Sequence, residues 1–205
     1  MISIIDYGVG NLFSLSSSLK FIGADVAVTS SAEDIAKSEK LFLPGVGAFA
    51  DAAKKLKESG LFDVIKKEAA GGKPLFGICL GMQMLFETSY EYGKHEGLAL
   101  VKGAVVPIAP VIEAGLKIPH IGWNALCFPQ GREKSPVFKY TNEGDHVYFV
   151  HSYHGDGTDG CVTATTEYGG ALTAAVGCGN VYGTQFHPEK SGDVGLNILR
   201  AFCEI

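Results

Sequence analysis

The sequence predicts an α/β fold with a mostly parallel central sheet that is flanked by helices and extended by antiparallel strands. In the first half of the chain, short apolar runs alternate with segments whose apolar residues recur at helical spacing. This alternation is typical of a parallel sheet with helices on both faces. In the last third, three strand-like runs are separated only by short turn sequences rich in glycine. Such spacing indicates an antiparallel meander.

The elements of the first half alternate regularly. Expected strands cover 2–7, 25–29, 40–43 and 74–78, and expected helices cover 12–22, 35–36, 48–58, 61–70 and 80–87. Gly23 ends the first helix, and Ser31 opens S-A-E-D, which resembles a capping box. Active loops of parallel α/β sheets lie at the carboxyl ends of the strands. We therefore expect the loops 8–11, 44–49 and 77–83 to meet.

The second half of the chain changes character. Expected strands cover 98–106, 146–153, 161–167, 170–176 and 181–186, and a helix over 192–202 closes the chain. The segment 146–153 is apolar and aromatic enough for a central strand, whereas 118–124 has the pattern of neither a helix nor a regular strand. Because no repeat or linker interrupts the chain, we expect one domain over residues 1–205.

Composition and charge exclude several classes of protein. The formal net charge is -5 and no basic cluster stands out, which argues against nucleic acid or an anionic membrane as the main partner. The apolar runs are strand-sized, so neither a signal peptide nor a spanning helix is expected. The five cysteines are scattered and form no C-x-x-C pair. This pattern predicts reduced thiols in a cytoplasmic protein, without a disulfide framework or a zinc site.

Cys79 is the first candidate catalytic residue. It stands between Gly77 and Gly81, where an expected strand runs directly into an expected helix, and G-x-C-x-G at such a corner is the pattern of a nucleophile elbow. The helix N-terminus should lower the pKa of the Cys79 thiol, and the N–H of Leu80 is well placed as an oxyanion donor. A lone cysteine is more often a buried core residue, but the two glycines favour a nucleophile.

A general base for this cysteine is expected at His187, the best candidate among six histidines. It leaves the end of an expected strand, and Glu189 follows two residues later. Side chains two residues apart in extended backbone point to the same side, and Pro188 should keep the segment extended. Glu189 is therefore expected to orient the imidazole that takes the proton of Cys79. H-P-E by itself is more often a surface turn, and its combination with the elbow favours catalysis.

The loop Pro44-Gly45-Val46-Gly47 is a second candidate element of the site. Glycines on both sides of Val46 permit unusual backbone angles, so N–H groups of this loop can point at a tetrahedral oxyanion. An ordinary glycine-rich turn is the alternative, and a Walker loop is excluded because G-K-[ST] is absent. His120, His151 and His154 lack an acidic partner at ligand spacing. We therefore expect structural or interfacial roles for them and no metal site.

Three motifs together resemble those of the class I (triad) glutamine amidotransferases. They are G-I-C-L-G-M-Q at 77–83, P-G-V-G-A-F at 44–49 and F-H-P-E at 186–189. Within this family the chain is most similar to the glutaminase subunits of imidazole glycerol phosphate synthases. That closer similarity depends on P-G-V-G in place of P-G-P-G, D-Y-G-V-G-N at 6–11, H-I-G-W-N at 120–124 and Y-F-V-H-S-Y at 148–153. The resemblance runs from the first strand to the last helix and implies a flavodoxin-like fold.

The resemblance implies a role for each residue that matches a family motif. Cys79 would attack the side-chain amide carbon of glutamine, His187 would move the protons, and Glu189 would orient His187. The other implied residues are oxyanion donors (Leu80, Val46, Gly47), glutamine contacts (Gly47, Gln83, Glu91, Ser152, Tyr153) and partner contacts (Asn11, Trp123, Tyr148, Lys190). The assignment of Glu91 depends on its spacing from Cys79. From residue chemistry alone, the two aromatic partner contacts are equally good core residues.

The implied activity is hydrolysis of glutamine to glutamate and ammonia through a cysteine thioester, without a cofactor. In this subfamily the ammonia passes to a (β/α)8-barrel cyclase subunit. The cyclase converts a phosphoribosyl intermediate (PRFAR) to imidazole glycerol phosphate and an aminoimidazole carboxamide ribotide (AICAR). Two alternatives stay open: the glutaminase subunit of another amidotransferase, such as anthranilate or aminodeoxychorismate synthase, and a stand-alone cysteine hydrolase. A scaffold subunit without catalysis is disfavoured because cysteine, histidine and glutamate are all present.

Overall fold

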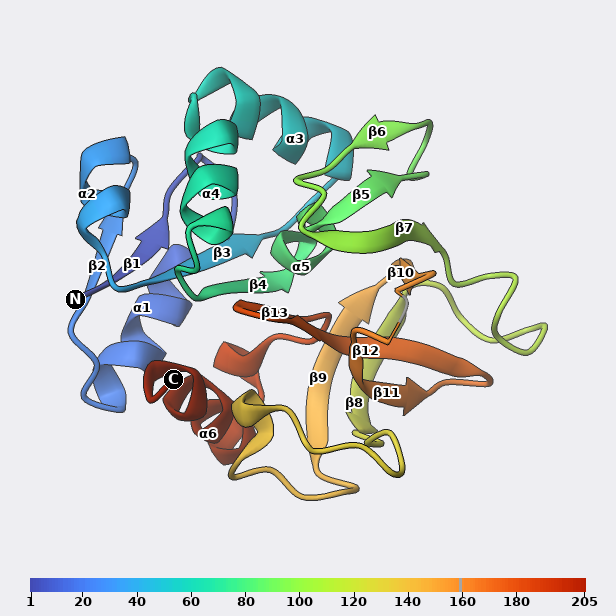
Figure 1. Cartoon of the computed structure of the whole chain (residues 1–205). Coiled ribbons are helices and arrows are strands. Elements are labelled where there is room, and N and C mark those ends of the chain that lie inside the picture. Colours follow the sequence, from blue (N-terminus) through green and yellow to red (C-terminus); the bar gives the residue numbers. More distant parts are fainter. Residues whose placement is uncertain (159) are drawn as a thin grey trace.

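The computed structural model describes residues 1–158 and 160–205, whose strands form three sheets, the largest of them with helices on both faces (Figure 1). The helices are α1 (Leu12–Phe21), α2 (Ala32–Lys37), α3 (Phe49–Glu58), α4 (Leu61–Ala70), α5 (Leu80–Met84) and α6 (Gly192–Cys203), with 3-10 turns η1 (Pro136–Phe138) and η2 (Pro188–Lys190). The strands are β1 (Ile2–Ile5), β2 (Val26–Thr29), β3 (Lys40–Gly45), β4 (Leu75–Cys79), β5 (Phe86–Ser89), β6 (His95–Glu96), β7 (Val101–Pro107), β8 (His120–Ala125), β9 (His146–His151), β10 (Tyr153–Asp156), β11 (Val162–Glu167), β12 (Ala171–Cys178) and β13 (Val181–Thr184).

The large sheet confirms the expected fold class. Its strand order is β11-β12-β13-β4-β3-β1-β2. The five strands from β13 to β2 are parallel, and β11 and β12 extend the sheet with antiparallel pairs. Apolar residues of α2, α3 and α4 pack in one core, and those of α1 and α6 pack in another. Helices therefore cover both faces of the sheet, as the alternating pattern indicated.

The helix after Cys79 is shorter than expected. It ends at Met84, and the chain continues into β5 instead of reaching Glu87 as a helix. Phe86 is fully buried and pairs with Val101 of β7 in a second, four-stranded sheet of order β10-β7-β5-β6. The helical pattern over 85–87 was therefore misleading, because long-range strand pairing and burial outweigh local helix propensity.

The prediction that 118–124 is neither a helix nor a regular strand is also wrong, because residues 120–125 form the regular strand β8. It pairs in antiparallel register with β9, which places His120 opposite His151 and Trp123 opposite Tyr148. These two strands form a sheet of their own, so the prediction that 146–153 is a central strand is wrong as well. Ile121 and Trp123 are exposed whereas His120 is buried. Apolar residues on the outer face of β8 hid the usual strand alternation.

Two of the five cysteines correct the expectation of reduced thiols. Cys161 and Cys178 form a disulfide, and Cys79, Cys127 and Cys203 carry free thiols. The antiparallel pairing of β11 with β12 brings the two Cα atoms to 5.4 Å, within the usual range for a disulfide. Sequence spacing alone could not show this proximity. Within the described residues, no helix is long and apolar enough to cross a membrane.

Candidate active site

The corner between β4 and α5 has the geometry of a nucleophile elbow. Cys79 ends the strand with φ 55° and ψ −112°, a backbone conformation that non-glycine residues rarely adopt and that is often found at active sites. β4 lies between β3 and β13, and Cys79 pairs in register with Gly45 of β3. The expected meeting of the carboxyl-end loops is confirmed, because one cavity is lined by Val46 and Cys79 and a neighbouring one by Gly10 and Val46.

The two glycines of the elbow allow close backbone packing. A Cβ at Gly77 would lie 2.7 Å from the carbonyl oxygen of Gly81, and a Cβ at Gly81 would overlap the carbonyl group of Leu43. A side chain at either position would therefore crowd the backbone beside it. The close approach of α5 to β3 and β4 holds the corner where Cys79 lies.

Gly81→Ala should lower the free energy of unfolding by about 2 kcal/mol, because the added methyl group forces α5 away from Leu43. Gly71→Ala is the matched control, since Gly71 has a helical φ of −75° and the nearest atoms to its added Cβ are 3.4 Å away. Urea denaturation of the two variants measures the difference. Equal stabilities would contradict this description of the elbow.

His187 and Glu189 follow the carboxyl end of β13, and their side chains are hydrogen-bonded to each other. His187 Nδ1 lies 2.9 Å from Oε1 of Glu189, and both side chains are 3% exposed. The expected pairing of the two side chains is present, but the expected extended backbone is not, because Pro188–Lys190 forms a 3-10 turn. Ser191 Oγ donates to the carbonyl oxygen of His187 at 2.7 Å. The turn, held by this serine, brings the carboxylate back to the imidazole.

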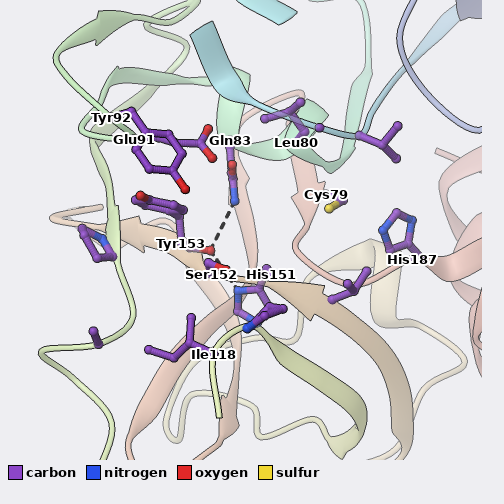
Figure 2. Close-up of a pocket in the computed structure, with 16 residues that line it drawn as sticks. Cys79, Leu80, Gln83, Glu91, Tyr92, Ile118, His151, Ser152, Tyr153 and His187 are labelled. Carbon is purple, nitrogen blue, oxygen red and sulfur yellow. Dashed lines mark hydrogen bonds between the residues drawn. The ribbon is translucent and has the colours of Figure 1, made fainter. Parts of the chain in front are cut away.

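The surroundings of His187 favour its charged form. Burial lowers the pKa of His187, but its hydrogen bonds to Cys79 and Glu189 and the charges of both partners raise it to about 10. Because Glu189 accepts from Nδ1, Nε2 remains for Cys79. Figure 2 shows the His187 ring beside the Cys79 sulfur at one end of the cavity. The arrangement supports an imidazolium next to the Cys79 sulfur.

Gln185 is a site residue that sequence reasoning missed. It is fully buried, and its Nε2 donates to Cys79 Sγ at 3.7 Å. Its Oε1 accepts from Gln83 Nε2 at 3.0 Å, which fixes the amide so that the NH2 group faces the sulfur. One feature of the sequence pointed to Gln185 as a site residue. It lies two residues before His187 at the end of a strand, and side chains at this spacing point to the same side.

The cavity beside Cys79 has a volume of about 670 Å³ and collects the residues expected to bind substrate. Gly47, Gln83, Glu91, Ser152 and Tyr153 all line it, together with Cys79, Leu80, Val46 and His187. Figure 2 shows the Glu91, Tyr92 and Tyr153 side chains at the end opposite Cys79 and His187. A nucleophile at one end and a carboxylate at the other suit a substrate with an electrophilic carbon and a distant cationic group.

Two contacts fix the far end of this cavity. Glu91 Oε2 accepts from the backbone N–H of Phe49 at 2.5 Å, at the start of α3. Gln83 Nε2 donates to the carbonyl oxygen of Tyr153 at 3.2 Å (Figure 2). The position of Glu91, expected from spacing alone, is therefore in the cavity wall.

Comparison with known proteins places this architecture in a family. Residues 3–204 match the family model of glutamine amidotransferase class-I. The chain belongs to the class I glutamine amidotransferase family. It is 49% identical over 206 residues to the imidazole glycerol phosphate synthase subunit HisH of Caldanaerobacter subterraneus subsp. tengcongensis, covering 100% of this chain and 98% of that protein. It is 46% identical to HisH of Lactococcus lactis, covering 99% and 98%.

Solved structures show that this amidotransferase also shares the fold of the wider family. A crystal structure of a glutamine amidotransferase matches with a TM-score of 0.75 and 20% identity, covering 100% of this chain and 99% of that one. The structure of PurLQS from Thermotoga maritima matches with a TM-score of 0.74 and 19% identity, covering 99% and 97%. The expected family, fold and enzyme class are therefore confirmed.

Three of the four partner contacts expected for the amidotransferase lie together on β8, β9 and η2. Trp123 is 54% exposed, and its ring centroid lies 6.1 Å from that of Tyr148. Lys190 Nζ lies 5.9 Å from the centroid of the Tyr148 ring. The Trp123 face, as we call these three residues, therefore presents aromatic surface beside a cation. Asn11 has a local role, since its side chain accepts from the backbone N–H of Ser14 and caps α1.

Proposed function

We propose that this chain is the glutaminase subunit of an imidazole glycerol phosphate synthase, and that it delivers ammonia to a (β/α)8-barrel cyclase subunit in the cytoplasm. The observation that carries the glutaminase chemistry is the buried His187 imidazole, which is hydrogen-bonded to Glu189 and lies beside the Cys79 sulfur at one end of the cavity (Figure 2). Full-length identities of 46–49% to proteins named HisH support the assignment to this synthase.

The first half of the reaction forms a thioester. The Cys79 thiolate attacks Cδ of glutamine, and a C–S bond forms as the carbonyl oxygen takes up negative charge. The N–H of Leu80 and an N–H of Val46 or Gly47 donate hydrogen bonds to this oxyanion. His187 gives its Nε2 proton to the amide nitrogen, the C–N bond breaks, and ammonia leaves.

The second half releases glutamate. Neutral His187 takes a proton from water while the water oxygen attacks the thioester carbon. The C–S bond then breaks, which restores the thiolate and the imidazolium. Throughout the cycle Glu189 accepts from Nδ1 and keeps Nε2 directed at Cys79, and Gln185 donates to the sulfur.

The cavity wall offers a partner for each polar end of glutamine. We assign the α-ammonium group to the carboxylate of Glu91, which lines the cavity. Gln83 and the backbone of Gly47, Ser152 and Tyr153 bind the remaining polar atoms. A substrate that lacks the α-ammonium group would lose its charged contact with Glu91, so glutamine is preferred over a simple amide.

The isolated chain should hydrolyse glutamine more slowly than its complex with the cyclase and the cyclase ligand, by a factor on the order of 5 to 150. The physical reason is the loop around Val46. The Val46 side chain is 43% exposed, and Gly47 has a positive φ of 95°. A backbone with this freedom can adopt a resting conformation in which its donor N–H points away from the oxyanion. The Trp123 face would receive the cyclase, whose binding favours the active arrangement of this loop.

A coupled glutamate assay with and without the cyclase and PRFAR measures this effect. The ammonia-accepting subunits of anthranilate and aminodeoxychorismate synthases serve as controls and should give no stimulation. Equal rates with and without the cyclase would overturn the assignment to this synthase. In that case a stand-alone cysteine hydrolase becomes the better description.

A further inference from the structure

His120 and His151 form a buried pair that the reaction described above does not use. His120 is fully buried and His151 is 6% exposed. The two residues are directly paired across β8 and β9, and His120 Nδ1 lies 2.9 Å from His151 Nε2. His151 also lines the cavity, next to Ser152 (Figure 2). The pair therefore connects the strand of the Trp123 face with the wall of the proposed glutamine site.

Each ring makes a second hydrogen bond to an oxygen that can only accept. His120 Nε2 lies 2.8 Å from Oδ1 of Asn124. The amide of Asn124 is oriented by its Nδ2, which donates to the carbonyl oxygen of Glu167 at 2.9 Å. Turning the amide over would place two acceptor oxygens against each other. On the other side of the pair, His151 Nδ1 lies 2.8 Å from the carbonyl oxygen of Tyr153. Both outer nitrogens must therefore carry a proton.

The contact between the rings needs a third proton. Two neutral imidazoles carry two protons, and the two outer bonds use both of them. Without another proton, two lone pairs would face each other across the 2.9 Å between His120 Nδ1 and His151 Nε2. Three hydrogen bonds on four ring nitrogens therefore require three protons, which gives the pair one positive charge.

The surroundings limit the pair to a single charge. Burial lowers the pKa of His120, although its hydrogen bond to Asn124 raises it. Burial and the charges of His120, His154 and His187 lower the pKa of His151 to about 3, although its hydrogen bond to the Tyr153 carbonyl raises it. Burial therefore opposes charge on either ring and excludes a second proton, so the one charge depends on the three hydrogen bonds. The one charge is offset by its hydrogen bonds and by aromatic faces, because His120 stacks between Phe149 and Tyr168 with centroid distances of 5.0 and 4.1 Å. An aromatic face attracts a cation.

We propose that His120 and His151 share one additional proton, and that the charged pair positions the Tyr153 carbonyl in the wall of the glutamine site. This carbonyl oxygen accepts from both His151 Nδ1 and Gln83 Nε2. Gln83 in turn donates to Gln185, which donates to Cys79. The identification of glutamine as the ligand of this cavity rests on the proposed function. The proton count rests only on the three hydrogen bonds.

The proton count is measured directly by nitrogen-15 NMR of the histidine rings in the full chain at pH 7.5. We expect three N–H protons on the four ring nitrogens of His120 and His151, with both outer nitrogens protonated. The His120→Asn and His151→Asn spectra assign the signals, and His146→Gln identifies the signals of a histidine outside the pair. One proton on each ring would overturn the proposal, whether or not the chain proves to be a glutaminase.

The positioning role is tested by kinetics in the complex with the cyclase. His120→Leu removes the proton donor to His151, so it should raise the KM for glutamine about tenfold and leave kcat within about twofold. His120→Asn places an amide N–H where Nδ1 was, so a neutral His151 accepts from it. In the wild type, deprotonation of the pair should raise the KM as the pH rises. We expect the KM of His120→Asn to stay within about threefold of the wild-type value and to show no such rise with pH.

His146→Gln is the matched control, because His146 is an exposed histidine on the same strand as His151. Its KM should equal that of the wild type at every pH. An unchanged KM in His120→Leu, or a loss confined to kcat, would overturn the positioning role. Failure of the proposed function has a different signature, namely no glutamine hydrolysis in the wild type while the NMR proton count is retained.

Discussion

Cys79→Ala should lower glutamine-dependent turnover of the synthase complex by at least about a thousandfold, because Cys79 carries the only thiol among the described residues that line the cavity. The same complex should still work with ammonium salt at high pH, since the cyclase then receives ammonia from solution. The two assays together separate loss of the nucleophile from loss of the fold. Glutamine hydrolysis that survives in Cys79→Ala would remove Cys79 from its proposed role.

Cys203→Ala is the matched control for this variant. Cys203 carries a free thiol on α6, and burial raises its pKa to about 11, so it remains a neutral thiol at the pH of the assay. Its removal should leave glutamine turnover within about twofold of the wild type. A large loss in this control would mean that thiol substitutions disturb the chain generally.

Glu189→Gln should lower kcat for glutamine about a thousandfold, because the amide no longer holds the proton on Nδ1 and the charged form of His187 loses its buried partner. The pKa of His187, about 10 in the native chain, should fall. NMR titration of His187 measures this shift directly. A His187 pKa that is unchanged in Glu189→Gln would contradict the orienting role of Glu189.

The Glu189→Gln substitution also alters how the free energy of unfolding depends on pH. The pKa of His187 is raised from 6.5 in its ordinary state to about 10 in the folded chain. Its contribution to stability is therefore fully present below pH 6.5 and is lost as pH rises toward 10. Denaturation curves between pH 6 and 10 should show this loss in the wild type. In Glu189→Gln the loss should be smaller and complete at a lower pH.

The parts of the site that follow local sequence rules were predictable. Few backbone conformations allow a strand to run directly into a helix at Gly77-Ile78-Cys79-Leu80-Gly81, so the elbow could be inferred from these five residues. His187 and Glu189 are two residues apart, and their pairing needed only a strand end and a short turn. The parallel order of the first strands likewise followed from regular alternation of apolar runs and helices.

The parts that depend on distant chain segments were not predictable. Gln185 reaches Cys79 across 106 positions, and only its place two residues before His187 distinguishes it from other buried polar residues. The disulfide between Cys161 and Cys178 and the pairing of β8 with β9 arise from strand register. The four-stranded sheet was missed for the same reason, since Phe86 is drawn into β5 by a partner strand that begins at Val101.

The most direct test of the central claim is covalent trapping of Cys79 in the complex with a diazoketone analogue of glutamine. We expect one adduct per chain, located by peptide mapping on Cys79, formed more slowly when glutamine competes and absent in Cys79→Ala. Glutamine hydrolysis in the wild type with no adduct on Cys79, or with the adduct on another residue, would contradict the role of Cys79 as the nucleophile.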